Sequence, residues 1–296
     1  MLTPGTPRGD SSGPRVLVGY DGSPGAAEAI AVGARLFPGA TAWIAYLWSP
    51  PFASHELFQQ LRRQARSLDE LSDLIEQEGG AEAQRLAASG VALALAAGWA
   101  GESVVRRSFG GEGFEMAALA EELDADLVLV GSRGLGGTRA ALGSVADLIV
   151  HYSPRPALVV PHPLASSEYE TLATGPIVVG WDGSAGANAA LDVAGELFPE
   201  RQLVAAEGLA EGDASLWPPD PARPRATAVR LPLRRATGAG RAVAAQLDAY
   251  AREHSAAAIV VGSRGHSALR EMLLGSVAKA TLHNVRRPVV VVRNPR

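Results

Sequence analysis

The chain has 296 residues, 47% of them hydrophobic, and its 27 Lys and Arg against 31 Asp and Glu give a formal net charge of −4. This length favours two domains of ordinary size, and the mildly acidic balance argues against a nucleic-acid-binding surface. The chain has no cysteine, which excludes disulfides, thiolate catalysis and cysteine-ligated metals, and its apolar runs are too short to span a membrane.

The predicted elements begin after residues 1–14, which lack the apolar stretch of a signal peptide and are expected to be a disordered tail of a cytoplasmic protein. The first apolar run ends in Asp21-Gly22-Ser23, where either Ser23 or Asp21 could cap the helix that follows. Apolar strands alternating with helices indicate a parallel sheet covered on both faces. The order expected in this half is strand 16–19, helix 24–37, strand 43–48, helix 55–88, strand 91–97, helix 114–123, strand 127–130, helix 138–150 and strand 157–160.

The second half repeats this design after a linker at 162–175. RVLVGYDGS at 15–23 recurs as PIVVGWDGS at 176–184, LVLVGSRG at 127–134 as AIVVGSRG at 258–265, and RPALVVP at 155–161 as RPVVVVR at 287–293. The second copy is shorter, because residues 209–225 hold four prolines and little periodicity and are expected to be a loop in place of the long helix. Within that loop Trp217 is expected to be a hydrophobic plug where the helix would lie.

Each half carries a glycine-rich loop directly after its fourth strand, GSRGLGGTRAALGS at 131–144 and GSRGHSALREMLLGS at 262–276. Glycine allows positive φ angles and close approach, so backbone N–H groups in such a loop can converge on a phosphate, and Ser276 would stand at a helix N-terminus that favours an anion. Asp182, after the first strand of its half, suits a neutral donor such as a ribose hydroxyl or an adenine amine. These features suggest a nucleotide spanning two loops; the alternative is that the glycines only make tight turns.

With G-x2-G-x9-G-S after an apolar strand, V-G-x-D-G-S at the start and P-V-V-V-V at the end, the chain resembles a tandem member of the universal stress protein family over about 15–161 and 176–293. The resemblance implies an α/β fold with two tandem doubly wound domains, 15–161 and 176–296. Each would have a five-stranded parallel sheet of strand order 3-2-1-4-5. It also implies ATP binding through the glycine loop and joining of the two domains through their last strands.

The resemblance further implies which residues contact the nucleotide. Leu47 would contribute its backbone near adenine, and the aspartates would lie on the adenosine side. Eight residues instead of nine separate Gly134 from Gly143, and the adenine wall of the second half reads Glu-Gly-Leu at 207–209. We therefore expect the second site to suit phosphate better and the first to shelter adenine better. The positions carried over are Asp21, Leu47, Gly131, Gly134, Gly143, Ser144, Val145, Asp182, Gly262, Gly265, Gly275, Ser276 and Val277.

The chain lacks the residues of a fast nucleotide hydrolase. A Walker loop needs a lysine before Ser or Thr, whereas the only lysine, Lys279, follows Ala278, and no carboxylate is placed to orient an attacking water. The six histidines show no metal-ligand spacing. The sequence predicts a stress regulator that binds ATP, with Mg²⁺ held through the phosphates, and forms a homodimer besides pairing its own halves. A nucleotide-free scaffold of the same fold and an ATP-using enzyme such as an adenylating synthetase are the alternatives.

Overall fold

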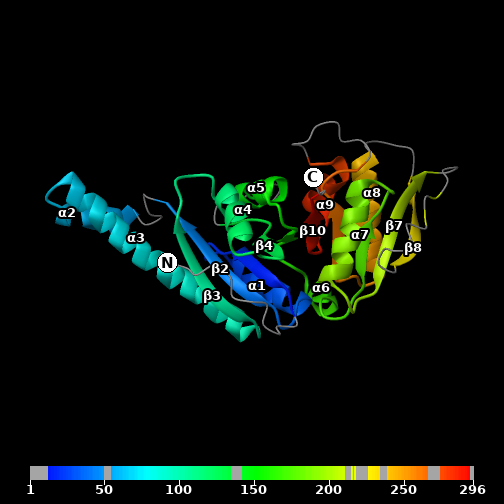
Figure 1. The fold of residues 1–296 in the computed structure, drawn as a ribbon, viewed down its shortest axis with the longest axis horizontal. Coiled ribbons are helices and arrows are strands. Elements are labelled where there is room, and N and C mark those ends of the chain that lie inside the picture. Colours follow the sequence, from blue (N-terminus) through cyan, green and yellow to red (C-terminus); the bar gives the residue numbers. More distant parts are fainter. Residues whose placement is uncertain are drawn as a thin grey trace.

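The computed structural model describes residues 13–49, 55–134, 142–210, 226–233, 239–265 and 274–293, together with Ser215 and Trp217. Across these residues ten strands form one sheet in the order β3-β2-β1-β4-β5-β10-β9-β6-β7-β8, and the two halves lie side by side in it (Figure 1). The strands are β1 (Arg15–Gly19), β2 (Thr41–Trp48), β3 (Ala100–Arg107), β4 (Leu127–Gly131), β5 (Ala157–Val160), β6 (Ile177–Gly180), β7 (Leu203–Ala210), β8 (Ala226–Leu233), β9 (Ala258–Gly262) and β10 (Val289–Val292).

Both halves have the doubly wound order that the resemblance implies. β3-β2-β1-β4-β5 is the order 3-2-1-4-5 of the first half, and β8-β7-β6-β9-β10 is the same order in the second. Every strand pair inside a half is parallel. In each half the connections reverse direction between the first and fourth strands, which is where open α/β sheets bind ligands.

The halves join through their last strands, as predicted. β5 and β10 pair antiparallel, with Leu158 opposite Val290 at the centre of the register. These two residues occupy equivalent places in the repeat, so a pseudo-twofold axis passes between them. Phe37 and Phe198 are also equivalent, and their rings stack with centroids 5.0 Å apart. The pairing uses an edge of each half that would otherwise be open to other strands.

Helices cover both faces of the sheet, so two apolar cores run across the whole molecule. One core lies under α1 and α7, and the other lies under α4, α5, α8 and α9. Residues of both halves contribute to each core, including Leu158 and Val290 in the first and Val159 and Val291 in the second. The helices are α1 (Pro24–Leu36), α2 (His55–Gln64), α3 (Leu68–Ala96), α4 (Glu112–Glu122), α5 (Ser144–Tyr152), α6 (Ser166–Thr171), α7 (Ala185–Leu197), α8 (Ala239–Glu253) and α9 (Ser276–Asn284).

The predicted third strand of the first half is wrong: residues 91–96 are helical, and Ala97 is the C-cap of that helix. Residues 91–96 form the last turns of α3, where Gly90 and Ala94 keep the buried helical spacing, and Gly98 ends the helix at a φ of +91°. Leu and Ala favour a helix there more strongly than the short apolar run favours a strand. The true third strand, β3, is at the sheet edge and buries only Val104, so it shows no apolar run in the sequence.

The long helical segment predicted at 55–88 is two helices. Ser67 starts α3 by accepting a hydrogen bond on its side chain from the backbone N–H of Glu70 at 3.1 Å. The first turns of α3, together with α2, extend beyond the sheet of the first half, and the described residues of the second half form no such arm at the β8 edge (Figure 1).

In the second half Trp217 takes the position that α3 occupies in the first. A Cβ on Gly90 of α3 would lie 2.6 Å from Ile44 and 2.9 Å from Tyr20, so the helix packs directly on Tyr20. Trp181 is the equivalent of Tyr20, and the Trp217 ring meets it edge-on at 5.2 Å. This contact agrees with the plug expected from the sequence.

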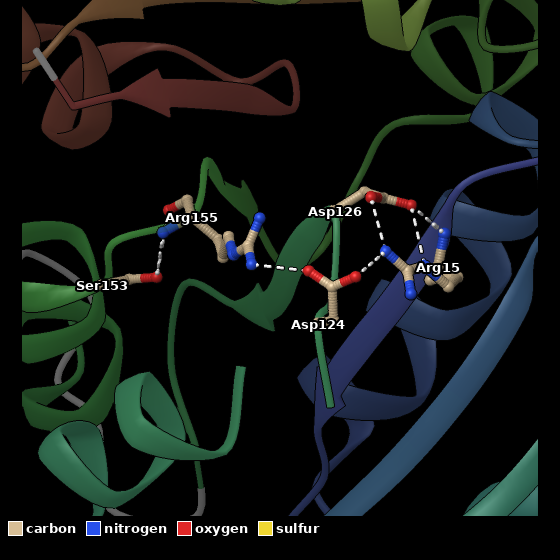
Figure 2. Close-up of polar contacts among 5 residues, drawn as sticks. All are labelled: Arg15, Asp124, Asp126, Ser153 and Arg155. Carbon is tan, nitrogen blue, oxygen red and sulfur yellow. Dashed lines mark hydrogen bonds and ion pairs between the residues drawn. The ribbon is translucent and has the colours of Figure 1, made fainter. Parts of the chain in front are cut away.

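An ion-pair network closes the base of the first half, at the amino ends of its strands (Figure 2). Asp124 accepts from Arg15 at 2.7 Å and from Arg155 at 2.8 Å, and Asp126 accepts from the Arg15 backbone N–H at 2.8 Å. The hydrogen bond from Arg15 is the main cause that lowers the pKa of Asp124. The network fastens the loop before β4 to the starts of β1 and β5.

The second half closes its base with the linker, which is not a featureless connection. Ser255 and Ala257 stand where the first half has Asp124 and Asp126, so Arg287 has no such carboxylates. Arg287 is buried and donates instead to Thr171 Oγ1 of α6 at 3.0 Å and to the Ala256 carbonyl. Burial lowers the pKa of the Arg287 guanidinium, which the charge of Glu168 opposes.

Several expectations fall outside the described residues. These are the tail up to residue 12, most of the loop at 209–225, residues 138–141 of the predicted helix, and the middle of both glycine loops at 135–141 and 266–273. The bounds of the two domains stay a proposal.

Candidate functional site

The Asp-Gly-Ser turns after β1 and β6 have the same geometry. Asp21 Oδ1 accepts from the backbone N–H of Ser23 at 2.9 Å, while Gly22 takes a φ of +79°. Ser23 then caps α1, because its side chain accepts from the Ala26 N–H at 3.1 Å. Of the two candidates, Ser23 is therefore the residue that caps α1, while Asp21 uses Oδ1 to close the turn before it. Asp182 and Ser184 repeat these contacts at 3.0 and 3.2 Å.

The second oxygen of each aspartate meets the glycine loop. A Cβ on Gly134 would overlap Asp21 Oδ2, and one on Gly265 would lie 2.6 Å from Asp182 Oδ2. Residues more than 80 positions apart in sequence are therefore in direct contact at the carboxyl ends of the two central strands of each half. The two parts of the predicted site come together in both halves.

Close approach, not backbone conformation, is what requires glycine in the described part of the loops. The glycines with positive φ lie elsewhere, at Gly22, Gly39, Gly98, Gly110, Gly111 and Gly183. Of the two glycine properties expected in the loop, positive φ and close approach, Gly134 and Gly265 use close approach. A side chain is excluded at both by the aspartate that lies against them.

Each glycine loop ends at a helix whose start has no side-chain cap. Gly143 and Gly275 are the N-cap residues of α5 and α9, and, as glycines, they supply no side-chain hydrogen bond to the first turn. The N–H of Gly143 donates to the Ser132 carbonyl at 2.8 Å, and that of Gly275 to Ser263 at 2.7 Å, which folds the loop back on its first residues. The helix starts therefore lie beside the loop, with backbone N–H groups that can bind an anion.

Ser144 and Ser276 begin these helices and are exposed, whereas Val145 and Val277 pack partly against the apolar core. Gly131 faces the first turn of α1, and Gly262 faces the first turn of α7. A Cβ on Gly131 would be 2.9 Å from the Gly25 carbonyl, and one on Gly262 would be 2.5 Å from that of Gly186.

Two buried hydroxyls in the loops were missed by the sequence reasoning. Ser132 and Ser263 are 9% and 6% exposed, and neither Oγ has a hydrogen-bond partner among the residues that the structure describes. Buried polar atoms rarely stay unpaired in native proteins. The signal was present in the sequence, since the two serines recur at the same place in both copies of Gly-Ser-Arg-Gly.

Leu47 stands one strand away, near the end of β2. The Tyr20 N–H donates to the Ala45 carbonyl at 2.9 Å, which places the end of β2 beside the turn that carries Asp21. Tyr46, also missed, borders the same region. Burial raises the pKa of its phenol, and the charges of Glu82 and Asp21 raise it further.

The second half differs at two points of this edge. Glu207 is 4% exposed at the end of β7, and its carboxylate accepts from Ser215 Oγ at 2.5 Å. The first turn of α8 reaches the loop, since a Cβ on Gly240 would lie 2.7 Å from Ser276 Oγ. A carboxylate and an extra helical turn thus border the second site, whereas Leu47 and Tyr46 border the first.

Comparison with known proteins accounts for this repeated arrangement. The family model described as "Universal stress protein family" matches residues 14–161 and, a second time, residues 174–293. The chain belongs to the universal stress protein family. A universal stress protein from Archaeoglobus fulgidus DSM 4304 aligns with 97% of the chain and 100% of its own at 17% identity and a TM-score of 0.63.

A functionally unknown protein from Pseudomonas aeruginosa PAO1 aligns with 96% of this universal stress protein and 94% of its own chain, at 12% identity and a TM-score of 0.52. At these identities the two solved structures show the shared tandem fold and nothing about ligands. Within the described residues, no helix has the length and apolar character that crossing a membrane requires. The same residues contain no group of three or more His, Asp or Glu side chains that could hold a metal ion.

Proposed function

We propose that this universal stress protein binds adenine nucleotide, ATP in the first place, at the carboxyl ends of the central strands in each half. The adenosine lies towards Asp21 and Leu47 in the first half and towards Asp182 in the second. The phosphates lie over the glycine loop and the start of α5 or α9, with any Mg²⁺ held through the phosphates. The protein acts as a stress-response regulator that responds to whether nucleotide is bound, not to nucleotide hydrolysis. Its proposed location is the cytoplasm, and a chain without cysteine needs no disulfides.

The observation that carries this proposal is the contact between the aspartate and the glycine loop, made twice. Gly134 and Gly265 admit the aspartate carboxylates so closely that a side chain would collide with them. A carboxylate there suits the neutral hydroxyls of a ribose, and the uncapped helix beside it suits phosphate. The hydroxyls of Ser132 and Ser263, which have no partner within the described part of the chain, add donors in the same loops.

Mass spectrometry of ligand released from the purified protein, followed by calorimetric titration with ATP, tests the proposal. We expect co-purified adenine nucleotide, or binding of at least one ATP per chain after its removal. No ligand and no heat of binding at millimolar ATP would contradict the proposal and favour the nucleotide-free scaffold, which the extensive core shared by the halves also supports.

We predict slow hydrolysis or none. The loops contain no lysine, and Asp21 and Asp182, whose carboxylates lie against Gly134 and Gly265, already accept hydrogen bonds within the Asp-Gly-Ser turns. Without a placed base or a loop cation, an in-line attack on the γ-phosphate has little help. Phosphate release from ATP should be far below about 1 per second, the low end for ordinary enzymes. A rate above that, or release of AMP and pyrophosphate, would favour the adenylating enzyme.

We also propose a homodimer. Because β5 and β10 pair within the chain, two chains would have to associate through other apolar surface. Sedimentation equilibrium gives the mass that checks this, and a monomer at tens of micromolar would contradict it.

A further inference from the structure

We propose that Glu28, His162 and Arg133 together position the glycine loop of the first half, and that their absence as a set from the second half makes the two nucleotide sites unequal. The expected effect on nucleotide affinity rests on the proposed function. The contacts among the three residues are present without any ligand. We call the three residues the loop anchor.

The loop anchor starts from α1. Glu28 is on this helix, and its side chain is 20% exposed. One carboxylate oxygen accepts from the backbone N–H of Leu164 at 3.0 Å, and the other contacts His162 Nδ1 in a short ion pair. A single carboxylate thus holds the start of the linker at two points against α1.

Arg133 connects that segment to the glycine loop. Its Nη2 donates to the His162 carbonyl at 2.5 Å. The three residues are therefore linked in series, from Glu28 to His162 and from His162 to Arg133. A guanidinium bonded in this way acts on the loop that carries it and not as a freely solvated phosphate ligand.

The backbone of Arg133 lies at the centre of the loop. A Cβ on Gly143 would be 3.4 Å from Arg133 Cα and 3.7 Å from the backbone nitrogen of Gly134. On the other side, a Cβ on Gly25 would be 2.9 Å from the Arg133 carbonyl. Because Arg133 packs between the first turn of α1 and Gly143, its orientation decides where the N–H groups of Gly134 and of the α5 start lie.

The second half lacks the carboxylate that begins the series. Ala189 stands at the place equivalent to Glu28, although the packing of Gly262 on Gly186 repeats that of Gly131 on Gly25. The first loop is also the one that is a residue shorter between its second and third glycines. Fixing this loop from outside lowers the ordering cost of binding, so the anchor compensates for the shorter loop.

The test isolates the first site in a Gly265→Val background, in which only that site binds ATP. Glu28→Ala and Arg133→Met should each weaken ATP binding roughly 10-fold, equal to about 1.4 kcal/mol. Because the residues act in series, the double variant Glu28→Ala/Arg133→Met should bind ATP no more weakly than the single variant with the lower affinity. Arg133→Lys keeps a donor for the His162 carbonyl and should restore most of the affinity. The matched control, Glu196→Ala, removes an exposed carboxylate from α7 and should change nothing.

Each result has a separate meaning. If the Gly265→Val protein binds ATP and Glu28→Ala leaves its affinity unchanged, the loop anchor is overturned while the proposed function stands. Additive losses in the double variant would also overturn it, because Arg133 would then act on the phosphates directly. If no ATP binds to the wild-type protein, the proposed function fails and hydrogen exchange decides the anchor alone. In ligand-free protein, Glu28→Ala should speed exchange of the Gly143 amide, and unchanged exchange would exclude positioning.

Discussion

At the scale of single residues, equivalent residues of the same type make different contacts in the two halves. Arg155 pairs with Asp124, whereas its equivalent Arg287 is buried among backbone and hydroxyl oxygens of the linker. Glycine likewise has two separate uses. Gly22 and Gly183 turn the chain at positive φ, while Gly134 and Gly265 make room for a carboxylate. A sequence motif therefore names a position without stating which property of the residue matters there.

Gly265→Val should abolish nucleotide binding in the second half. The new side chain must displace the Asp182 carboxylate, which lies 2.6 Å from the position of the Cβ, and it also crowds the loop. Losing two or three hydrogen bonds to phosphate, at about 1.5–3 kcal/mol each, weakens affinity roughly 100-fold or more. Calorimetric titration measures the effect, and circular dichroism checks the fold.

Gly134→Val should act in the same way on the first site, because Asp21 lies as close to Gly134. Gly80→Ala is the control, since a Cβ on this α3 glycine would meet nothing within 4 Å. A folded Gly265→Val protein with unchanged total affinity and stoichiometry would show that the second loop is only a turn.

The base of the first half should respond to acid through Asp124. Its folded-state pKa is lowered by Arg15 and Arg155, so the stabilisation is fully present above the ordinary aspartate pKa of about 3.9 and is lost as pH falls through the lower folded-state value. Asp124→Asn should flatten the decline of unfolding free energy between about pH 5 and pH 3. Urea unfolding at several pH values measures this, with Asp73→Asn on the exposed face of α3 as the control. Parallel pH curves for wild type and Asp124→Asn would contradict the assignment.

At the scale of elements, the linker helix α6 closes the base of the second half. Leu172, directly after it, is fully buried, and Arg201 donates to the Leu172 and Ala173 carbonyls. A Cβ on Gly175 would lie 2.8 Å from both Ala257 N and Thr171 O. The helix thus closes the base of the second half, at the place equivalent to the ion-pair network of the first half (Figure 2).

Thr171→Val should destabilise the protein by about 1–3 kcal/mol, because it leaves buried Arg287 with one hydrogen-bond acceptor fewer. The substitution preserves the shape of the side chain, so the decrease in unfolding free energy measures the contribution of the Thr171 hydroxyl. Thr174→Val, at an exposed position of the same linker, should stay within about 0.5 kcal/mol of wild type. Equal effects of the two variants in urea unfolding would show that the linker does not lock Arg287.

At the scale of the whole molecule, the two halves share their sheet and both cores. β5 and β10 form the seam, and the Phe37–Phe198 stack lies across it. Since each core contains residues from both halves, neither half buries its own apolar surface fully without the other. We therefore expect the tandem repeat to unfold as one unit.

Leu158→Ala should destabilise both halves together by about 2–5 kcal/mol, since Leu158 is fully buried at the centre of the seam. Hydrogen exchange with mass spectrometry should show the β4 and β9 peptides gaining exchange at the same denaturant concentration. Loss of protection in β4 alone would mean that the halves unfold independently.

The strand order and the pairing of the last strands were expected from the resemblance to the universal stress protein family. The sequence by itself determined the alternation of strands and helices, the repeat and the position of the glycine loops. Each of these rests on local patterns: apolar runs, turn residues and the spacing of motifs that recur. The carboxyl ends of parallel strands meet at one edge, so the approach of Asp21 to Gly134 also followed once the strand order was expected.

The tertiary structure alone decided where the third strand lies, what the linker does and which residues hold the first loop. β3 is an edge strand with little to bury, so its sequence carries no apolar signal, whereas the end of α3 satisfies helical propensity and packing on β2 at once. Glu28 and Arg133 lie 105 positions apart, and only folding brings each to His162. Contacts between distant residues depend on how whole elements pack, which no local pattern in the chain encodes.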